Sequence, residues 1–311
     1  MNKKIFNLLI IVIALVMTSA CSSSGEITVA SYNVRYDNRG DAEKGNAWKN
    51  RCPVITGIIR FNDFEIVGAQ EVLHHMVEDM LAGLPGYDFV GVGRDDGETK
   101  GEYAPIFYKT DRFELLKSGH FWLSEETDFP NKGWDAVLPR ICTWGEFRDK
   151  QSKLRFYFFN LHMDHVGVKA REESSKLVLR KIEEMCGDAP VILTGDFNVD
   201  QQHDNYRVLA ESGVLNDSYE VTRMRFALNG TFNAFDPNLK TESRIDHIFV
   251  TRDFNVERYG ILTDTYREQV NDSIIQKGDF PKEVHFLDHV ARLPSDHFPV
   301  MVKLSFGKPS R

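Results

Sequence analysis

Short apolar runs that stop at a polar residue recur along this chain and define its predicted architecture. The clearest run is residues 191–194, which are all apolar or β-branched. Gly195 follows this run and lets the backbone turn, so that Asp196 and Asn198 project together from the end of a buried strand. Taken alone, this stretch fits equally well a helix cap or an Asx turn made by the two polar residues.

The same patterns predict the other elements, because strands repeat every two residues and helices about every 3.6. Further strands are predicted at residues 27–34, 65–72, 87–93, 103–109, 140–147, 154–162, 244–251 and 295–304. Helices are predicted near residues 48–59, 73–83, 168–185 and 205–211, and an irregular segment at 264–293. We find no internal repeat and no low-complexity linker. This order predicts one domain in which two sheets pack face to face and helices cover them.

The N-terminus has the pattern of an export signal. Lys3 and Lys4 precede an apolar run at residues 5–17, which is too short to span a bilayer comfortably. Small residues then lead to Cys21, which resembles the lipidated cysteine of a bacterial lipobox, although Thr18 stands where leucine is usual. Ordinary signal cleavage nearby is the alternative. We expect export to the bacterial cell envelope and a membrane contact through a lipid anchor at Cys21 only.

Composition and charge narrow the class of protein. The 311 residues are 42% hydrophobic and 12% aromatic, which permits a sizeable core. Removing Lys3 and Lys4 from the 38 basic residues leaves 36 against 46 acidic residues, a formal charge of −10. Such a chain has no broad electrostatic attraction for nucleic acid. A phosphate substrate remains compatible with it, because a bound metal and a few arginines reverse the local sign of the charge.

Cysteine usage adds little chemistry. Besides Cys21, only Cys52, Cys142 and Cys186 are present, an odd and sparse set for an oxidising compartment. We expect at least one buried free thiol. No cysteine spacing indicates a zinc site, and nothing indicates a catalytic cysteine.

Polar residues at the ends of predicted strands form the candidate site. They are Asn33, Glu71, His162, Asp196, Asn198, Asp246, Asp296 and His297. Their oxygen donors suit Mg²⁺ or Mn²⁺. Histidines beside carboxylates suit an anion whose charge grows during a reaction, because an acidic partner orients the imidazole and keeps it protonated. Phosphoester hydrolysis requires these parts together.

Five separated motifs resemble the endonuclease/exonuclease/phosphatase superfamily, which has the DNase-I-like fold. They are Ser-Tyr-Asn at 31–33, Gln-Glu at 70–71, Asn-Leu-His-Met-Asp-His at 160–165, Gly-Asp-Phe-Asn at 195–198 and Ser-Asp-His-Phe-Pro at 295–299, supported by Arg-Ile-Asp at 244–246. The resemblance covers essentially all of residues 26–305. It implies an α+β fold, a four-layered α/β/β/α sandwich of two packed mixed β-sheets flanked by helices. We divide the chain into a signal peptide (1–21), a tether (22–26), this domain (27–306) and a tail (307–311).

The resemblance also implies how the matched residues divide the chemistry of the metal and the water. Glu71 would be the principal ligand of Mg²⁺ or Mn²⁺, with Asn33 as its neighbour. Asp296 would bind the metal region or support the site. Asp196 would orient or deprotonate the attacking water, and Asn198 would hold a phosphate oxygen.

Further matched residues would act on the phosphoryl group. His162 and His297 would donate to its oxygens. Glu102 would support the first histidine, on a short match, and Asp246 would support the second. Candidates for contact with the substrate, each equally compatible with a place at the rim of the site, are Arg94, Asp164 and His165.

Fold and motifs together indicate a reaction class but not a substrate, because this superfamily cleaves nucleic acids, inositol phosphates, sphingomyelin and sugar phosphates. Nucleases depend on Lys/Arg contacts along the phosphate backbone, and this chain has no dense basic run. Lipid cleavage favours an exposed apolar hairpin beside the site; residues 226–228 and 284–287 are candidates, but we expect both in the core.

We therefore expect a metal-dependent hydrolase of a small, sugar or lipid-linked phosphate ester. One alternative is an envelope nuclease that acts on DNA or RNA. The other, from a different class, is a non-catalytic binding module of the same fold. The sequence does not indicate an oligomeric state.

Overall fold

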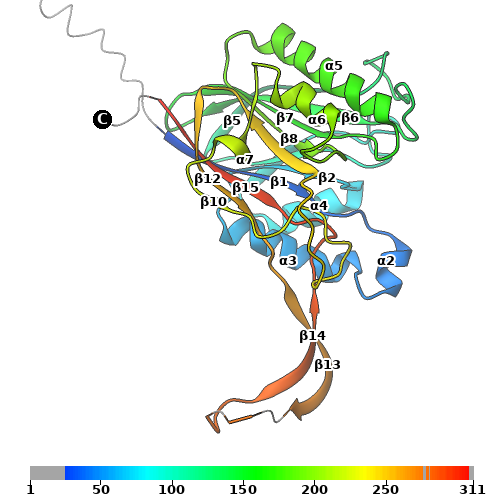
Figure 1. Cartoon of the computed structure of the whole chain (residues 1–311), viewed down its shortest axis with the longest axis vertical. Coiled ribbons are helices and arrows are strands. Elements are labelled where there is room, and N and C mark those ends of the chain that lie inside the picture. The colour runs from blue at the N-terminus through cyan, green and yellow to red at the C-terminus, as the bar shows by residue number, and fades with distance from the viewer. Residues whose placement is uncertain (1–24, 276–277, 280, 308–311) are drawn as a thin grey trace, which may run out of the picture.

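Two mixed β-sheets pack face to face, and helices cover the outer face of each sheet (Figure 1). The computed structural model describes residues 25–275, 278, 279 and 281–307. The predicted signal peptide, Cys21, most of the tether and most of the tail therefore lie outside the described residues. The predicted four-layered α/β/β/α sandwich is confirmed.

The elements of each layer are as follows. The first sheet has the order β10 (Arg225–Phe226), β12 (Phe254–Ile261), β15 (Val300–Phe306), β1 (Gly25–Asn33), β2 (Ile66–Gln70), β4 (Ile106–Lys109) and β3 (Tyr87–Val90). The second has the order β5 (Phe113–Trp122), β6 (Ile141–Asp149), β7 (Arg155–His162), β8 (Val191–Asp196), β11 (Asp246–Val250) and β9 (Asn216–Asp217). The helices are α2 (Arg39–Glu43), α3 (Trp48–Phe61), α4 (His74–Gly83), α5 (Val168–Cys186), α6 (Asp204–Ala210) and α7 (Ser218–Val221).

The central strands are apolar on both faces because each one lies between two hydrophobic cores. In β1, Ile27 and Val29 point into the core between the sheets, whereas Ala30 and Tyr32 join the core formed with α3 and α4. The corresponding strand of the second sheet is β8, whose outer face packs with α5 and α6. Successive side chains of a strand point to opposite faces, so a two-sided strand has the nearly continuous apolar pattern seen in the sequence.

Parallel pairing brings the polar strand ends together at one edge of the sandwich. Strands β1 and β2 are parallel, with Asn33 opposite Gln70. Strands β7 and β8 are also parallel, with His162 opposite Asp196. Parallel neighbours run in the same direction, so residues that end both strands lie at the same edge of a sheet.

A buried polar contact joins the two sheets just below these strand ends. Asn160 of β7 donates from Nδ2 to the backbone oxygen of Ala69 at 2.7 Å. Its Oδ1 accepts a hydrogen bond from Nε2 of Gln70, also at 2.7 Å. Gly68 permits this close approach, because a Cβ there would clash with the side chain of Thr194. The two sheets therefore hold one relative position directly beneath the candidate site.

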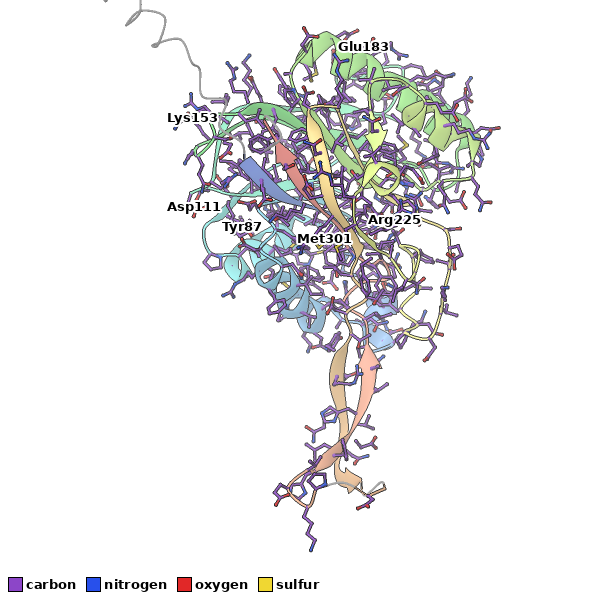
Figure 2. All side chains as sticks on the ribbon, turned by 60° about the vertical axis from the view of Figure 1, so that its left-hand side comes forward. Tyr87, Asp111, Lys153, Glu183, Arg225 and Met301 are labelled. Carbon is purple, nitrogen blue, oxygen red and sulfur yellow. The ribbon has the colours of Figure 1, made fainter. Side chains whose placement is uncertain are left out.

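The prediction that residues 264–293 are irregular is wrong. Strands β13 (Tyr266–Ile275) and β14 (Phe286–Arg292) form an antiparallel arm that projects from the body (Figures 1 and 2). The arm does not contribute a residue to the three main hydrophobic clusters of the described chain, except for Leu293 at its end. Its strands therefore lack a strong apolar periodicity that would have revealed them.

Two apolar stretches expected in the core are also exposed. Phe226, on the two-residue edge strand β10, is 62% exposed, and Leu228, two residues later, is 69% exposed. Phe286 and Leu287, which lie on the arm, are 48% and 45% exposed. The core placement predicted for both stretches is wrong, because neither one lies on a strand that is covered on both faces.

Other sequence predictions hold with smaller changes. The four predicted helices are present, and two short helices, α2 before α3 and α7 after β9, were not predicted. The closing strand β15 begins at Val300, five residues later than predicted. Cys52, Cys142 and Cys186 are all buried free thiols. Among the described residues, none of the helices has the length and apolar character needed to cross a bilayer.

Candidate active site

The strand ends of both sheets surround a cavity of about 500 Å³. Loops and strands from the whole length of the chain contribute to it. Its lining residues are Arg35, Tyr36, Glu71, Arg94, Glu102, Leu138, Arg140, His162, His165, Asp196, Asn198, Phe232, Asp296 and His297. Most of the predicted site residues are in this set. Asn33 and Asp246 lie behind it, where they contact residues of the wall.

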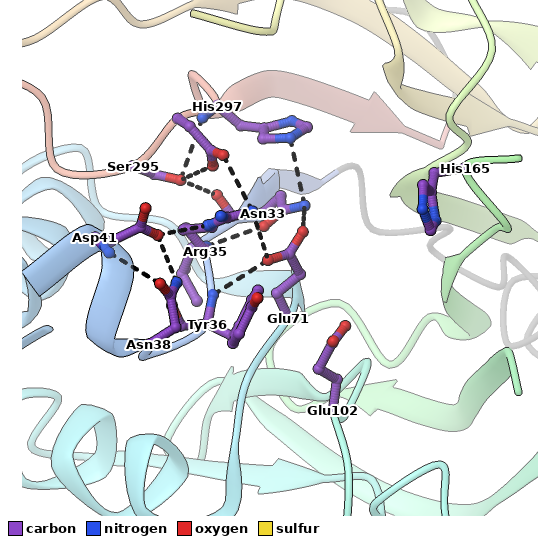
Figure 3. A network of polar contacts seen from close by, with 12 residues as sticks. Asn33, Arg35, Tyr36, Asn38, Asp41, Glu71, Glu102, His165, Ser295 and His297 are labelled. Carbon is purple, nitrogen blue, oxygen red and sulfur yellow. Dashed lines mark hydrogen bonds and ion pairs between the residues drawn. The ribbon is translucent and has the colours of Figure 1, made fainter. Parts of the chain in front are cut away.

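Asn33 links two carboxylates of opposite sheets. Its Nδ2 donates to Oε1 of Glu71 at 3.0 Å (Figure 3). The same Nδ2 donates to Oδ2 of Asp196 at 2.9 Å, and Oδ1 of Asn33 accepts from the backbone N–H of Arg35. The carboxylates are thus held close together despite their like charge. The end of β1 therefore organises the centre of the site.

Glu71, Asp196 and His297 form a compact group, and its two carboxylates fit a divalent cation. One potential ligand atom from each residue lies within 4.8 Å of the others. Carboxylate oxygens are the preferred protein ligands of Mg²⁺ and Mn²⁺, and one small cation would relieve the repulsion between Glu71 and Asp196. The donor set therefore fits such an ion. Asp296, which was predicted to bind the metal or to support the site, lies 3.5 Å from the guanidinium of Arg35.

The backbone is unusual where these residues project. Arg35, Glu71 and Asn198 have φ angles of 56°, 61° and 51°. Non-glycine residues seldom adopt positive φ, and asparagine tolerates it better than most. Strained conformations of this kind persist where surrounding contacts hold them and are concentrated at functional sites. Here the backbone N–H of Tyr36 donates to Oε2 of Glu71, and the N–H of Asn198 donates to Oδ1 of Asp196.

His297 and Asp246 form a buried pair. Nδ1 of the histidine lies 2.9 Å from Oδ2 of the aspartate. Burial alone would lower the pKa of His297, but the carboxylates of Asp246 and Asp196 outweigh it and raise the pKa well above its usual value. His297 is therefore protonated at neutral pH, and its other nitrogen faces Asp196 at 3.8 Å.

His162 has the opposite electrostatic character. Burial lowers its pKa well below the usual value, and the nearby charges of Arg140 and Arg94 lower it further. Nδ1 of His162 lies 3.8 Å from Oε2 of Glu102, beyond hydrogen-bond distance. Glu102 instead accepts two hydrogen bonds from Arg94, both at 2.8 Å. The neutral imidazole of His162 therefore lies near Glu102, its predicted partner, but the Glu102 carboxylate is hydrogen-bonded to Arg94 instead.

Asp196 has the properties of a base that works near neutral pH. Burial is the largest cause of its raised pKa, and the nearby charge of Asp246 adds to it, giving a value of about 7. The charge of His297 and the hydrogen bond from Asn33 act in the opposite direction. Asp196 is only 1% exposed, and it lies in the wall of the cavity between the two histidines.

Comparison with known proteins identifies the family. The profile of the endonuclease/exonuclease/phosphatase family matches residues 30–297, a span that contains the cavity and nearly all of the five motifs. The chain belongs to the endonuclease/exonuclease/phosphatase family. Members of this family are hydrolases that act on phosphoester bonds, either as phosphatases or as nucleases, and they are generally dependent on divalent metals.

Several relatives of this family member are similar over most of its length. A solved family protein from Bacteroides thetaiotaomicron is 53% identical and has a TM-score of 0.85, covering 92% of this chain and 99% of that chain. A mannosyl-6-phosphatase from the same species is 54% identical with a TM-score of 0.82, covering 89% and 99%. An uncharacterized protein of Acanthamoeba polyphaga mimivirus is 28% identical over 268 residues, covering 82% of this chain and 91% of the viral protein.

Of the three residues predicted as candidates for substrate contact, two line the cavity and one does not. Arg94 and His165 line the cavity. Asp164 does not line it, so the predicted contact with substrate is not supported. The Asp164 carboxylate accepts hydrogen bonds from backbone N–H groups, including those of Val166 and Gly167, and from Nε of Arg140. Its role in the structure is to support the loop and Arg140.

Sequence reasoning missed several residues of the cavity wall, namely Arg35, Tyr36, Leu138, Arg140 and Phe232. The sequence positions of two of them could have indicated a place in the site. Arg35 follows closely after the strand-end residue Asn33, and Arg140 begins a predicted strand that pairs with the His162 strand. Phe232 had no such signal. It reaches the site because it forms a β-bridge with His297, and their rings lie 5.1 Å apart.

Proposed function

We propose that this protein is a divalent-metal-dependent phosphomonoesterase that acts on a sugar phosphate. The observation that carries the proposal is one cavity of about 500 Å³ that joins the Glu71–Asp196–His297 group to Arg94, Glu102 and Arg140. Small-molecule sites are commonly about 300–1,000 Å³ and are concave, with a few placed polar groups. The relative that is 54% identical, described as a mannosyl-6-phosphatase, supports a sugar as the leaving group.

The proposed chemistry uses four residues of this chain. Asp196, with a pKa of about 7, accepts a proton from the attacking water. His297 donates a charged hydrogen bond to a phosphoryl oxygen, while Asp246 keeps the imidazole oriented and protonated. His162, whose pKa is lowered mainly by burial, is neutral and donates an uncharged N–H to another phosphoryl oxygen. A bound Mg²⁺ or Mn²⁺, held by the carboxylates of Glu71 and Asp196, would neutralise phosphate charge and lower the pKa of bound water.

Charge favours a small ester over a nucleic-acid polymer. A protein that binds a phosphate backbone needs several Lys/Arg contacts along its path, whereas this chain without Lys3 and Lys4 has a formal charge of −10. The cavity arginines Arg35, Arg94 and Arg140 are each paired with a carboxylate. A nuclease activity is therefore less favoured.

Product release from a substrate panel tests the proposal. Protein spanning residues 22–311 is assayed with Mg²⁺ or Mn²⁺ on hexose 6-phosphates, inositol phosphates, sphingomyelin, single- and double-stranded DNA, and RNA. We expect sugar phosphates to be preferred and Asp196→Ala or His297→Ala to reduce turnover by about 10²–10⁴-fold with folding intact. Preferential cleavage of a polymer would replace the proposal with a nuclease, and binding of metal without any turnover would indicate a binding module.

We also propose that the protein is exported and anchored through a lipid on Cys21. The support is the order of charged, apolar and small residues that precedes this cysteine. Labelling of bacteria with a fatty-acid analogue checks it: the wild-type protein is expected to carry label, and Cys21→Ser is expected to carry none. Export of an unlabelled wild-type protein would instead indicate ordinary signal cleavage.

A further inference from the structure

A rigid polar cluster forms part of the cavity wall away from the Asn33–Glu71 contact. Figure 3 shows two of its members, Glu102 and His165, set apart from Asn33 and Glu71. Arg94 holds both carboxylate oxygens of Glu102 at 2.8 Å, and the indole N–H of Trp122 donates to the Arg94 carbonyl at 2.8 Å. The Arg94 and Glu102 side chains are therefore fixed before any substrate binds.

Arg140 adds an unused donor to this wall. Its Nε donates to Asp164 at 3.3 Å, and its Nη2 lies 2.9 Å from Nδ1 of His165. Its Nη1 is buried and has no hydrogen-bond partner among the described residues, although Arg140 is only 3% exposed and lines the cavity. Buried donors are nearly always paired in folded proteins, so an unpaired one in a cavity wall indicates a place for an acceptor on a ligand.

The charges of this cluster favour neutral groups over a second anion. Arg94 is paired with Glu102, and Arg140 is paired with Asp164, so two guanidinium groups face two carboxylates. A carboxylate that accepts one hydrogen bond on each oxygen still has lone pairs free. The wall thus offers donors and acceptors with balanced charge. A hydroxyl group, which both donates and accepts, matches this combination.

We propose that Arg140, with the Arg94–Glu102 pair, binds hydroxyl groups of the sugar leaving group and selects polyol phosphates over other phosphomonoesters. This inference rests on the proposed phosphatase function and names the part of the substrate that the function leaves open. Arg140 is the specificity-determining residue, because its Nη1 is the unpaired donor. Tyr36 and Phe232, which line the same cavity, supply apolar surface for the C–H faces of a sugar ring.

The test compares two substrates that differ in the leaving group. We measure kcat/KM for a hexose 6-phosphate and for phenyl phosphate, whose leaving group carries no other hydroxyl. Arg140→Gln and Arg140→Lys are expected to lower the ratio of hexose to phenyl ester by about 10–100-fold, the range for loss of one buried hydrogen bond to a substrate. The ratio does not depend on the fraction of folded enzyme, so partial misfolding does not alter it.

Arg112→Gln is the matched control. Arg112 also forms an ion pair with a buried aspartate, Asp149, but it does not line the catalytic cavity. Its variant is expected to keep the wild-type substrate ratio. Deoxy-hexose 6-phosphates add a second measurement: the wild type should discriminate against the analogue that lacks the contacted hydroxyl, and Arg140→Lys should not.

The outcomes separate the two proposals. An equal loss on both esters in the Arg140 variants, together with unchanged discrimination against every deoxy analogue, would overturn the hydroxyl subsite and leave the phosphatase standing. Failure of the wild type to hydrolyse either ester, with metal bound, would overturn the proposed function and the subsite with it.

Discussion

Nδ1 of His297 lies 2.9 Å from Oδ2 of Asp246, and both side chains are almost fully buried. Asp246 makes the largest contribution that raises the pKa of His297 against the opposing effect of burial. Asp246→Asn keeps the shape of the carboxylate and removes its charge. The imidazole then loses its proton more easily, and we expect kcat on a sugar phosphate at neutral pH to fall by about 10²–10⁴-fold.

The control for this variant is Asp204→Asn, because Asp204 has an exposed carboxylate on α6. It is expected to retain the wild-type kcat. If Asp246→Asn kept its turnover within a few-fold of wild type while remaining folded, a charged His297 would not be needed for the reaction.

Metal binding should depend on Glu71. A ligand that binds only the folded protein raises its melting temperature, and a cation held by Glu71 and Asp196 would act in this way. We expect Mg²⁺ or Mn²⁺ to raise the melting temperature of the wild type, and excess chelator to reverse the shift. Glu71→Gln should reduce the shift strongly, whereas Glu43→Gln on the exposed helix α2 should not. Equal shifts in all three proteins would place the metal elsewhere.

Arg51 should position the loops of the site without entering it. Its side chain lies on α3 and is completely buried. The guanidinium donates at 2.6–3.0 Å to backbone oxygens of Val34, Arg35, Asn46 and Pro294. These contacts join the loop after Asn33 to the loop before Asp296.

Arg51→Lys keeps the positive charge but cannot reach all of these carbonyls. Buried acceptors left unpaired cost about 1–3 kcal/mol each, so we expect the free energy of unfolding in urea to fall by about 2–4 kcal/mol. Turnover should fall as well, because both loops carry site residues. Arg39→Lys, on the exposed face of α2, serves as the control. Unchanged unfolding of Arg51→Lys would show that the carbonyls find other donors.

Stability should depend on pH through His247, which lies behind the site. Burial lowers the pKa of His247, and the Asp217 carboxylate only partly opposes that shift. The unfolded chain, with a pKa near 6.5, therefore binds the proton more readily than the folded protein does. The stability from this residue is complete above that value and is lost as the pH falls below it.

His247→Gln retains a donor for the Val199 carbonyl, which lies 3.0 Å from Nε2 of the histidine, but it does not titrate. Between about pH 7.5 and 5.5, we expect the wild type to lose about 1 kcal/mol more unfolding free energy than this variant. Other histidines titrate in both proteins and cancel in the difference. Urea unfolding at the two pH values measures it, and equal losses would show that His247 remains neutral in both states.

The parts of the fold that sequence reasoning predicted well are those with a strong local pattern. The strand at residues 191–194 is apolar on both faces because it lies between two cores, and helix α5 has its apolar positions at helical spacing. The projecting arm was missed because its described side chains bury little apolar surface, and the exposed Phe226 was misassigned because an apolar residue alone does not indicate burial.

The sequence by itself determined which chemical groups are available and where strands end, since glycine, amides, carboxylates and histidines interrupt the apolar runs at Asn33, Glu71, His162 and Asp196. Only the tertiary structure decided which of these groups meet. Asn33 and Asp196 are 163 residues apart, and their contact depends on the packing of two sheets across Asn160 and Gln70. The packed interior also gives the two histidines opposite pKa shifts. Burial lowers the pKa of both, but His162 lies near arginines and His297 lies near carboxylates that raise its pKa, and a linear pattern does not contain these neighbours.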